Sequence, residues 1–163
     1  MLDNTSALQD RFAPTTRCFG CGPANEKGLR IKSYVHGDTA VCSWTPEAHH
    51  EAFPGMLNGG ICGALLDCHS NWCAAWHLMN LAGASTPPCT VTSEFSVKLK
   101  RPTPTVTGPL TMAARVVEST DTQATVEATL SATMPDGSMK VTATCRGVFV
   151  AVREGHPAFH RWG

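Results

Sequence analysis

Residues 54–80 read PGMLNGGICGALLDCHSNWCAAWHLMN, and this stretch decides how the rest of the chain is organised. The paired glycines Gly59 and Gly60 follow the turn-forming Pro54-Gly55 and open an apolar run that predicts one long helix to about Asn80. The first N–H groups of a helix lack partners within it and lie at the positive end of the macrodipole. Such a helix start suits a carbonyl oxygen that gains negative charge during a reaction.

The predicted helix has two different faces. Bulky side chains recur at helical spacing on one of them, namely Ile61, Leu65, Cys68, Trp72, Trp76 and Met79. Small side chains, one carboxylate and its neighbouring amide occupy the other, namely Gly60, Gly63, Ala64, Asp67, Ser70, Asn71 and Ala74. The bulky stripe is expected to anchor the helix in a core, and the small face allows another surface or a ligand to approach. Asp67 and Asn71 are four residues apart and can meet on that face.

Length and composition exclude several classes of protein. The chain has 163 residues, 42% hydrophobic and 16% charged, which predicts one domain with a sizeable core. The formal net charge is zero and the pI is about 7.0, so neither a nucleic-acid coat nor a polybasic membrane anchor is expected. No apolar run is long and pure enough to span a bilayer.

The eight cysteines are expected to be free thiols. Residues 1–6 are polar and lack the apolar region of a signal peptide, and several cysteines fall inside the apolar helix and strands. These features predict a reduced, cytoplasmic protein.

The rest of the chain predicts an α+β fold. Strands are expected at residues 29–35, 39–44, 91–100, 110–117, 124–134 and 139–152, with a turn at His36-Gly37-Asp38 and a loop at 46–54. Short turns between the later strands indicate an antiparallel sheet, with the helix packed on one face. A lead at 1–28 precedes the main domain at 29–152, and an irregular tail at 153–163 follows it.

Several motifs together resemble the hotdog-fold acyl-CoA thioesterases of the phenylacetate-degradation type. They are the lead Cys18-Phe19-Gly20-Cys21-Gly22-Pro23-Ala24-Asn25 with Gly28-Leu29, then Phe53-Pro54-Gly55, Gly59-Gly60, Leu65-Leu66-Asp67 and Lys100-Arg101-Pro102-Thr103-Pro104. The resemblance covers roughly residues 18–152 and rests on the order and spacing of these pieces.

This resemblance implies a sheet wrapped around the central helix and a two-fold dimer with sites between subunits, commonly paired into tetramers. It implies hydrolysis of acyl-CoA thioesters without a metal or cofactor. The matched positions are Gly59, whose N–H would bind the thioester carbonyl, and Asp67, which would act as general base on water or as nucleophile. The matched strand hydroxyl is Thr92, ten residues before Pro102, which would position water.

Two departures from the family pattern motivate an alternative to efficient hydrolysis. Asn58 stands where the family usually has His before the glycine pair, and Ala52 stands where some branches have Asn or Gln. Asn58 is a good helix N-cap but cannot titrate as an imidazole does. The alternative is therefore an acyl-CoA binding or sensing protein without efficient catalysis.

Other residues are candidates for binding substrate. His50 precedes the glycine turn and could line the pocket entrance or lie exposed in a loop, and Asn71 and Thr92 could orient groups around Asp67. Gly60 belongs to the helix start. Lys98, Lys100 and Arg101 form the densest basic patch, which could hold the phosphates of CoA or be a solvated strand face.

The two cysteines of the lead also allow other chemistries. Cys18 and Cys21 could be half a zinc site completed by Cys42 or His36, or a redox pair, but a structural loop with free thiols is favoured because the second pair of a zinc finger is missing.

A serine-hydrolase elbow and a phosphate loop are absent from the sequence, which argues against those activities. A hotdog dehydratase would need a catalytic histidine, and His49, His50, His69 and His77 offer no clear match. His69 and His77 are expected to be structural.

Overall fold

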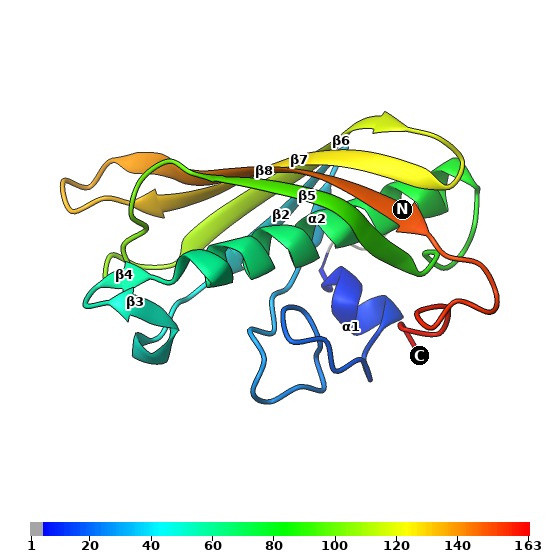
Figure 1. Cartoon of the computed structure of the whole chain (residues 1–163), viewed down its shortest axis with the longest axis horizontal. Coiled ribbons are helices and arrows are strands. Elements are labelled where there is room, and N and C mark those ends of the chain that lie inside the picture. The colour runs from blue at the N-terminus through cyan, green and yellow to red at the C-terminus, as the bar shows by residue number, and fades with distance from the viewer. Residues whose placement is uncertain (1–4) are drawn as a thin grey trace.

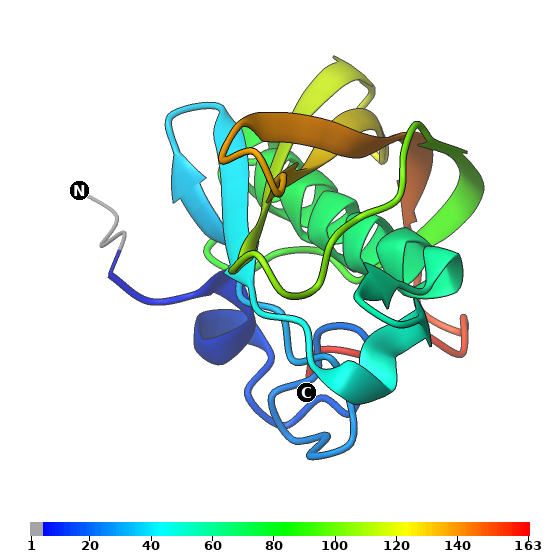
Figure 2. The same cartoon turned by 90° about the vertical axis from the view of Figure 1, so that its left-hand side faces the viewer.

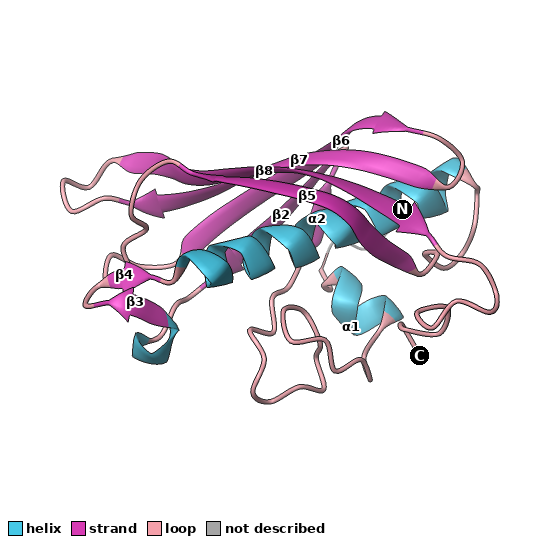
Figure 3. Ribbon diagram, viewed as in Figure 1, coloured by secondary structure: helices cyan, strands magenta, loops and turns pink. Residues whose placement is uncertain are grey.

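A computed structural model describes residues 5–163, so residues 1–4, which belong to the start examined for a signal peptide, lie outside the described part. Its elements in chain order are α1 (Leu8–Phe12), β1 (Tyr34–His36), β2 (Thr39–Trp44), the 3-10 turn η1 (Ala48–His50), β3 (Glu51–Phe53), β4 (Met56–Leu57), α2 (Gly59–Leu81), β5 (Thr90–Leu99), β6 (Leu110–Ser119), β7 (Gln123–Thr133) and β8 (Met139–Ala151). One long helix and long antiparallel strands dominate the structure (Figures 1 and 3).

Six strands form an antiparallel sheet in the order β1-β2-β6-β7-β8-β5, and β3 pairs only with β4. The sheet curves around α2 (Figure 2), which confirms the predicted α+β hotdog fold. The ten-residue β5 is one edge of the sheet and the three-residue β1 is the other. The alternation predicted for 124–134 holds, because Ala124, Val126 and Leu130 are fully buried against the helix side.

Both faces of α2 are covered, by different parts of the chain. The small-residue face lies against the sheet, where Ser70 Oγ is 3.5 Å from Cys145 Sγ of β8 and Ala74 is fully buried. The bulky stripe meets the lead and the tail: the Trp72 ring lies 4.5 Å from that of Trp162, and the Trp76 ring lies 6.4 Å from that of Phe12. Around Ser70 and Ala74, the surface that approaches the small face is therefore the protein's own sheet, whereas Gly60 is exposed and Gly63 and Asp67 are only partly buried.

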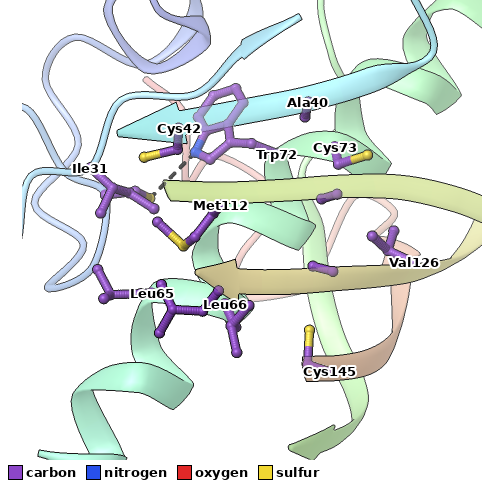
Figure 4. Packing of buried hydrophobic residues seen from close by; sticks show 14 of the residues in the cluster. Ile31, Ala40, Cys42, Leu65, Leu66, Trp72, Cys73, Met112, Val126 and Cys145 are labelled. Carbon is purple, nitrogen blue, oxygen red and sulfur yellow. Dashed lines mark hydrogen bonds between the residues drawn. The ribbon is translucent and has the colours of Figure 1, made fainter. Parts of the chain in front are cut away.

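The core lies between α2 and the sheet and continues beneath the helix. Leu66, Met112 and Val126 pack there, and Ile31 brings the lead into the same cluster (Figure 4). Leu66 is fully buried, so truncating it to alanine would cost about 2–5 kcal/mol.

The strand predicted at residues 29–35 is mostly wrong, since only Tyr34–His36 joins the sheet. The preceding residues bond the lead instead: the N–H groups of Leu29 and Ile31 donate to the carbonyls of Phe19 and Gly20. Arg30 has φ +52°, which interrupts an extended strand. The predicted loop at 46–54 contains η1 and β3.

A buried polar chain ties the lead to the helix, and α1, which takes part in it, was not predicted. Gln9 Nε2 donates to Ser33 Oγ, which lies 2.8 Å from His69 Nδ1. His69 Nε2 lies 3.1 Å from the carbonyl of Ala40 and must be the donor there, because a carbonyl only accepts. His69 is therefore a structural histidine, as predicted. No helix among residues 5–163 combines the length and apolar character needed to cross a membrane.

Candidate functional site

Asn58 caps the start of α2. Its Oδ1 accepts from the backbone N–H of Gly60 at 2.8 Å and of Ile61 at 3.2 Å, while its carbonyl accepts from Ile61 and Cys62. The predicted N-cap is thus present. Because the cap occupies the N–H of Gly60, this N–H is not available to bind a substrate. Gly60 belongs to the candidate site only as part of the helix start.

The N–H of Gly59 remains open. It has no hydrogen-bond partner among residues 5–163. A Cβ added at Gly59 would lie 2.9 Å from Leu99 Cδ1, so the helix start is crowded on the β5 side. Gly59 can therefore offer one unpaired donor at the positive end of the helix.

Asp67 and Thr92 meet between α2 and β5. Thr92 Oγ1 donates to Asp67 Oδ1 at 2.7 Å. Burial raises the pKa of the Asp67 carboxyl above its ordinary value, whereas the Thr92 hydrogen bond and the Arg161 charge lower it. The nearby Cys18 sulfur adds slightly to the increase in the Asp67 pKa. Asp67 is therefore a partly buried carboxylate with a fixed orientation, of the kind used as a base or nucleophile.

A bulge at Ser93 brings Thr92 to the helix side of β5. Thr92 pairs with the inward-facing Phe149, but Glu94 pairs with Val148, so the register shifts between them. Strict alternation would place Thr92 on the outer face with Glu94. The extra residue reverses this, and Ser93 Oγ donates to the Val148 carbonyl at 3.1 Å.

Asn71 is buried one helical turn beyond Asp67 and has its own partner. Its Oδ1 accepts a hydrogen bond from Thr90 Oγ1, two residues before Thr92. Four helix residues rise about 6 Å and two strand residues about 6.8 Å, so the two pairs lie side by side along α2 and β5. Asn71 thereby extends the polar strip that contains Asp67.

His50 is buried at the end of η1 and serves the turn before the helix. Its Nδ1 accepts from the Glu47 N–H at 2.9 Å, and its carbonyl accepts from the Asn58 N–H at 3.0 Å. Its ring lies 4.9 Å from that of Trp44. Burial lowers the pKa of His50, and the charge interaction with His49 lowers it further. The His50 ring is therefore held neutral next to the helix start.

The three basic candidates do not lie together with Asp67. Lys98 is on the outer face of β5 with Ser96, beside the cavity of about 540 Å³ that Arg115 and Arg146 also line. Lys100 and Arg101 follow Leu99 and are exposed, and both of their N–H groups donate to the Thr142 carbonyl. Lys100 and Arg101 follow the end of β5 where Leu99 lies against Gly59. They are therefore nearer to the start of α2 than they are to Asp67.

One chain does not bring Gly59 and Asp67 to the same point. Eight residues of α-helix rise about 12 Å, whereas a reacting carbonyl must lie about 3 Å both from its N–H donor and from the attacking oxygen, which the carboxylate supplies or activates. A site that uses both groups on one substrate therefore needs residues from two copies of the chain.

Two neighbours of Asp67 were not identified from the sequence. Arg161 reaches from the tail, where its Nη1 donates to the Thr90 carbonyl at 2.7 Å, and Cys18 comes from the lead. Neither segment has a periodic pattern that signals its position. Among the described residues, the one group with metal-ligand spacing is Cys18, Cys21 and Cys68.

Solved structures of other proteins share the fold of this chain. No family model matches the chain, and no curated protein matches it. A thioesterase superfamily protein from Shewanella loihica PV-4 is similar in structure, with TM-score 0.61 and 24% identity over 80% of this chain and 98% of that one.

Two further solved structures have the same fold. The Escherichia coli PaaI protein from the phenylacetic acid degradation operon has TM-score 0.58 and 20% identity over 77% of this chain and 81% of its own. A thioesterase family protein from Silicibacter pomeroyi has TM-score 0.62 and 20% identity over 76% and 85%, respectively. At these identities the likeness establishes the fold, which is the one that the sequence resemblance implied.

Proposed function

We propose that this protein is an acyl-CoA thioester hydrolase that acts as a homodimer or a dimer of dimers. The observation that carries the proposal is the Thr92–Asp67 hydrogen bond of 2.7 Å, which orients a partly buried carboxylate on the side of α2 next to the open edge of the sheet. A partly buried carboxylate without a cationic side chain bonded to it is costly, so its retention favours a chemical role.

The edge strand β5 is the surface that supports dimer formation. It presents ten residues of unpaired strand edge, and Phe95 and Leu99 on its helix side are 38% and 58% exposed. A Cβ at Gly63 would lie 3.9 Å from the Phe95 ring, so these apolar groups adjoin the helix face that carries Asp67. A second copy on this edge would cover them and bring its own Gly59 toward Asp67.

The proposed reaction divides between the two copies. The N–H of Gly59 in one copy donates to the thioester carbonyl oxygen and stabilises the negative charge that develops there. Asp67 of the other copy takes a proton from water, whose oxygen attacks the carbonyl carbon, or attacks that carbon itself. The C–S bond breaks, and CoA leaves as the thiolate and takes up a proton. In the first route this releases the carboxylic acid directly. In the second route it leaves a mixed anhydride on Asp67, which a water molecule then hydrolyses to the carboxylic acid and the free Asp67 carboxylate.

The remaining candidates have supporting roles in this proposal. Thr92 and Asn71 hold the polar strip around the reaction centre, and His50, Asn58 and Gly60 shape the helix start. Lys100 and Arg101, with Lys98 farther out, would bind the phosphates of CoA. No cofactor is required, and a reducing cytoplasmic setting suits eight free cysteines.

The experiment is release of free CoA from short, medium, long and aromatic acyl-CoAs by wild type and by Asp67→Asn. Asp38→Asn, in an exposed turn, is the matched control. An enzyme-only blank is needed because the protein's own thiols react with a thiol reagent. Turnover by wild type and Asp38→Asn but not by Asp67→Asn supports the proposal, and near-normal turnover by Asp67→Asn rejects it.

The second candidate is an acyl-CoA binding or sensing protein, favoured by Asn58. Its side chain is engaged in capping and cannot exchange a proton as an imidazole can. A rise in thermal stability with acyl-CoA, without CoA release from any substrate, would establish this function instead.

A further inference from the structure

Three cysteine sulfurs gather where the lead meets α2. Cys18 and Cys21 come from the lead and Cys68 from the helix, and their Sγ atoms all lie within 4.8 Å of one another. The Sγ atoms of Cys18 and Cys68 are 3.7 Å apart although 50 residues separate them. Cys21 is buried, while Cys18 and Cys68 are half-buried.

The surrounding chain is built around these sulfurs. Gly20 lies against Cys68, where an added Cβ would be only 2.4 Å from Sγ, so a side chain at this position would displace the cluster. The Gly22 N–H donates to the Cys18 carbonyl and closes the turn between the two lead cysteines. Trp72 Nε1 donates to Cys21 Sγ at 3.3 Å, which orients one sulfur.

The spacing of the sulfurs suits a metal ion. A metal bound to sulfur at about 2.3 Å places its ligands about 3.8 Å apart in tetrahedral geometry and about 4.0 Å apart in trigonal geometry. The observed separations, 3.7 Å for one pair and at most 4.8 Å for the others, need only small side-chain movements to reach those values. Metal ligands in proteins are commonly held in place by hydrogen bonds from neighbouring groups, and the Trp72 N–H supplies such a bond to one of these sulfurs.

We infer that Cys18, Cys21 and Cys68 form a three-thiolate site for one thiophilic d¹⁰ metal ion, Zn²⁺ or Cu⁺, which fastens the lead to α2. Thiolates select these soft ions over Mg²⁺ and Ca²⁺. The third ligand is Cys68 and neither Cys42 nor His36, the residues considered from the sequence, since these two are not within the cluster.

The cluster adjoins the candidate site, because Cys68 follows Asp67 in α2, but its proposed role is structural and does not depend on hydrolysis. It bridges segments about 50 residues apart, so its effect should be on the stability of the contact between lead and helix. An ion that binds only the folded chain raises stability by mass action. The inference stands or fails on metal binding whether or not the protein hydrolyses thioesters.

The test uses the full chain, reduced, freed of metal with a chelator and kept anaerobic. Equilibrium dialysis against Zn²⁺, and separately against Cu⁺, measures stoichiometry, and thermal unfolding measures stability with each ion. We expect one ion per chain and a rise in Tm of about 5–10 °C at saturating metal for the ion that the site selects.

Matched variants locate the binding. Cys68→Ser and Cys18→Ser should each weaken binding by about 100-fold or more and abolish the Tm rise, since each removes one of three thiolates. Cys89→Ser, a half-buried cysteine outside the cluster, should bind as wild type. Cooperative unfolding of each variant in the presence of chelator shows that the variant is folded. Two ligand variants are used so that the test can still be made if one of them does not fold.

Three results would overturn the inference. One is reduced protein that binds neither ion. Another is binding that Cys68→Ser and Cys18→Ser leave unchanged, because other thiols would then be the ligands. The third is an air-exposed protein with a Cys18–Cys68 disulfide whose reduced form has no metal affinity, which would make the cluster a redox pair.

Discussion

The hydroxyl of Thr92 reaches the carboxylate of Asp67 because β5 carries one extra residue at Ser93. Without that bulge, Thr92 would lie on the outer face of the sheet with Glu94. Asp67 would then lose its only described side-chain donor among residues 5–163. The geometry of the candidate site therefore depends on a local irregularity of the strand as much as on the two side chains.

Thr92→Val should reduce CoA release by about 10-fold or more, because the carboxylate loses its orienting donor. The same loss raises the pKa of Asp67, so the acid limb of the pH–rate profile should move to higher pH. Thr92→Ser should restore both properties, and Thr111→Val, at an exposed strand threonine on β6, serves as the matched control. An unchanged pH profile in Thr92→Val would show that the hydrogen bond does not govern the reacting group.

Asn58→Ala should lower the free energy of unfolding by about 1 kcal/mol, since it leaves the N–H of Gly60 without its acceptor and removes one of the two acceptors of the Ile61 N–H. Asn58→Ser should retain most of the stability. Urea denaturation of the three proteins is the measurement. Equal stabilities for Asn58→Ala and wild type would mean that the cap contributes nothing to folding.

The fully buried His69 should make stability depend on pH. Burial lowers its pKa to about 4 from 6.5, so below pH 6.5 the unfolded chain binds a proton that the folded chain does not. The contribution of the neutral His69 to the free energy of unfolding is complete above pH 6.5 and is lost as the pH falls toward 4. At pH 5 the loss is about 2 kcal/mol.

Urea unfolding of metal-free protein between pH 7.5 and 5, beside the uncharged His69→Gln variant, measures this contribution. Wild type should lose more stability over the range than the variant does. Parallel profiles for the two proteins would exclude His69 as the source of the dependence.

Trp162→Ala should destabilise the protein by about 3 kcal/mol. The indole is 7% exposed, stacks on Trp72 at 4.5 Å and donates from Nε1 to the Pro88 carbonyl at 2.9 Å. His160→Ala, on the exposed side of the tail, should change stability by less than about 0.5 kcal/mol. Thermal unfolding distinguishes the two, and similar Tm values for both variants would mean that the tail is not docked in solution.

Charge on the β5 edge should prevent self-association. Phe95→Lys and Leu99→Asp place charges on the exposed apolar surface that we propose is covered by a second copy. Light scattering after gel filtration should show a dimer or tetramer for wild type and monomers for these variants. Met139→Lys, an equally exposed apolar position on β8, is the control. A wild-type monomer would contradict the two-copy site.

The sequence predicted those parts of the fold whose patterns are regular. The helix at α2, the alternation of β7 and the N-cap at Asn58 each follow from neighbouring residues alone, and the structure contains them. The strand predicted at 29–35 failed because Leu29 and Ile31 find backbone partners in the lead, which periodicity does not reveal. For the same reason the sequence did not indicate that Arg161 and Cys18 adjoin Asp67, since both lie in irregular segments whose positions are set by tertiary contacts.

The two-sided burial of α2 also affects how the protein can be shortened. Cutting at the boundaries expected from the strands, after residue 28 and before residue 153, would keep the sheet but remove Phe12, Cys21 and Trp162 from the bulky side of the helix. Trp72 and Trp76 would then be exposed to water as one continuous apolar patch, and such a surface is prone to aggregation. For expression and crystallisation the smallest workable unit is therefore wider than the hotdog core, and it includes both flanking segments.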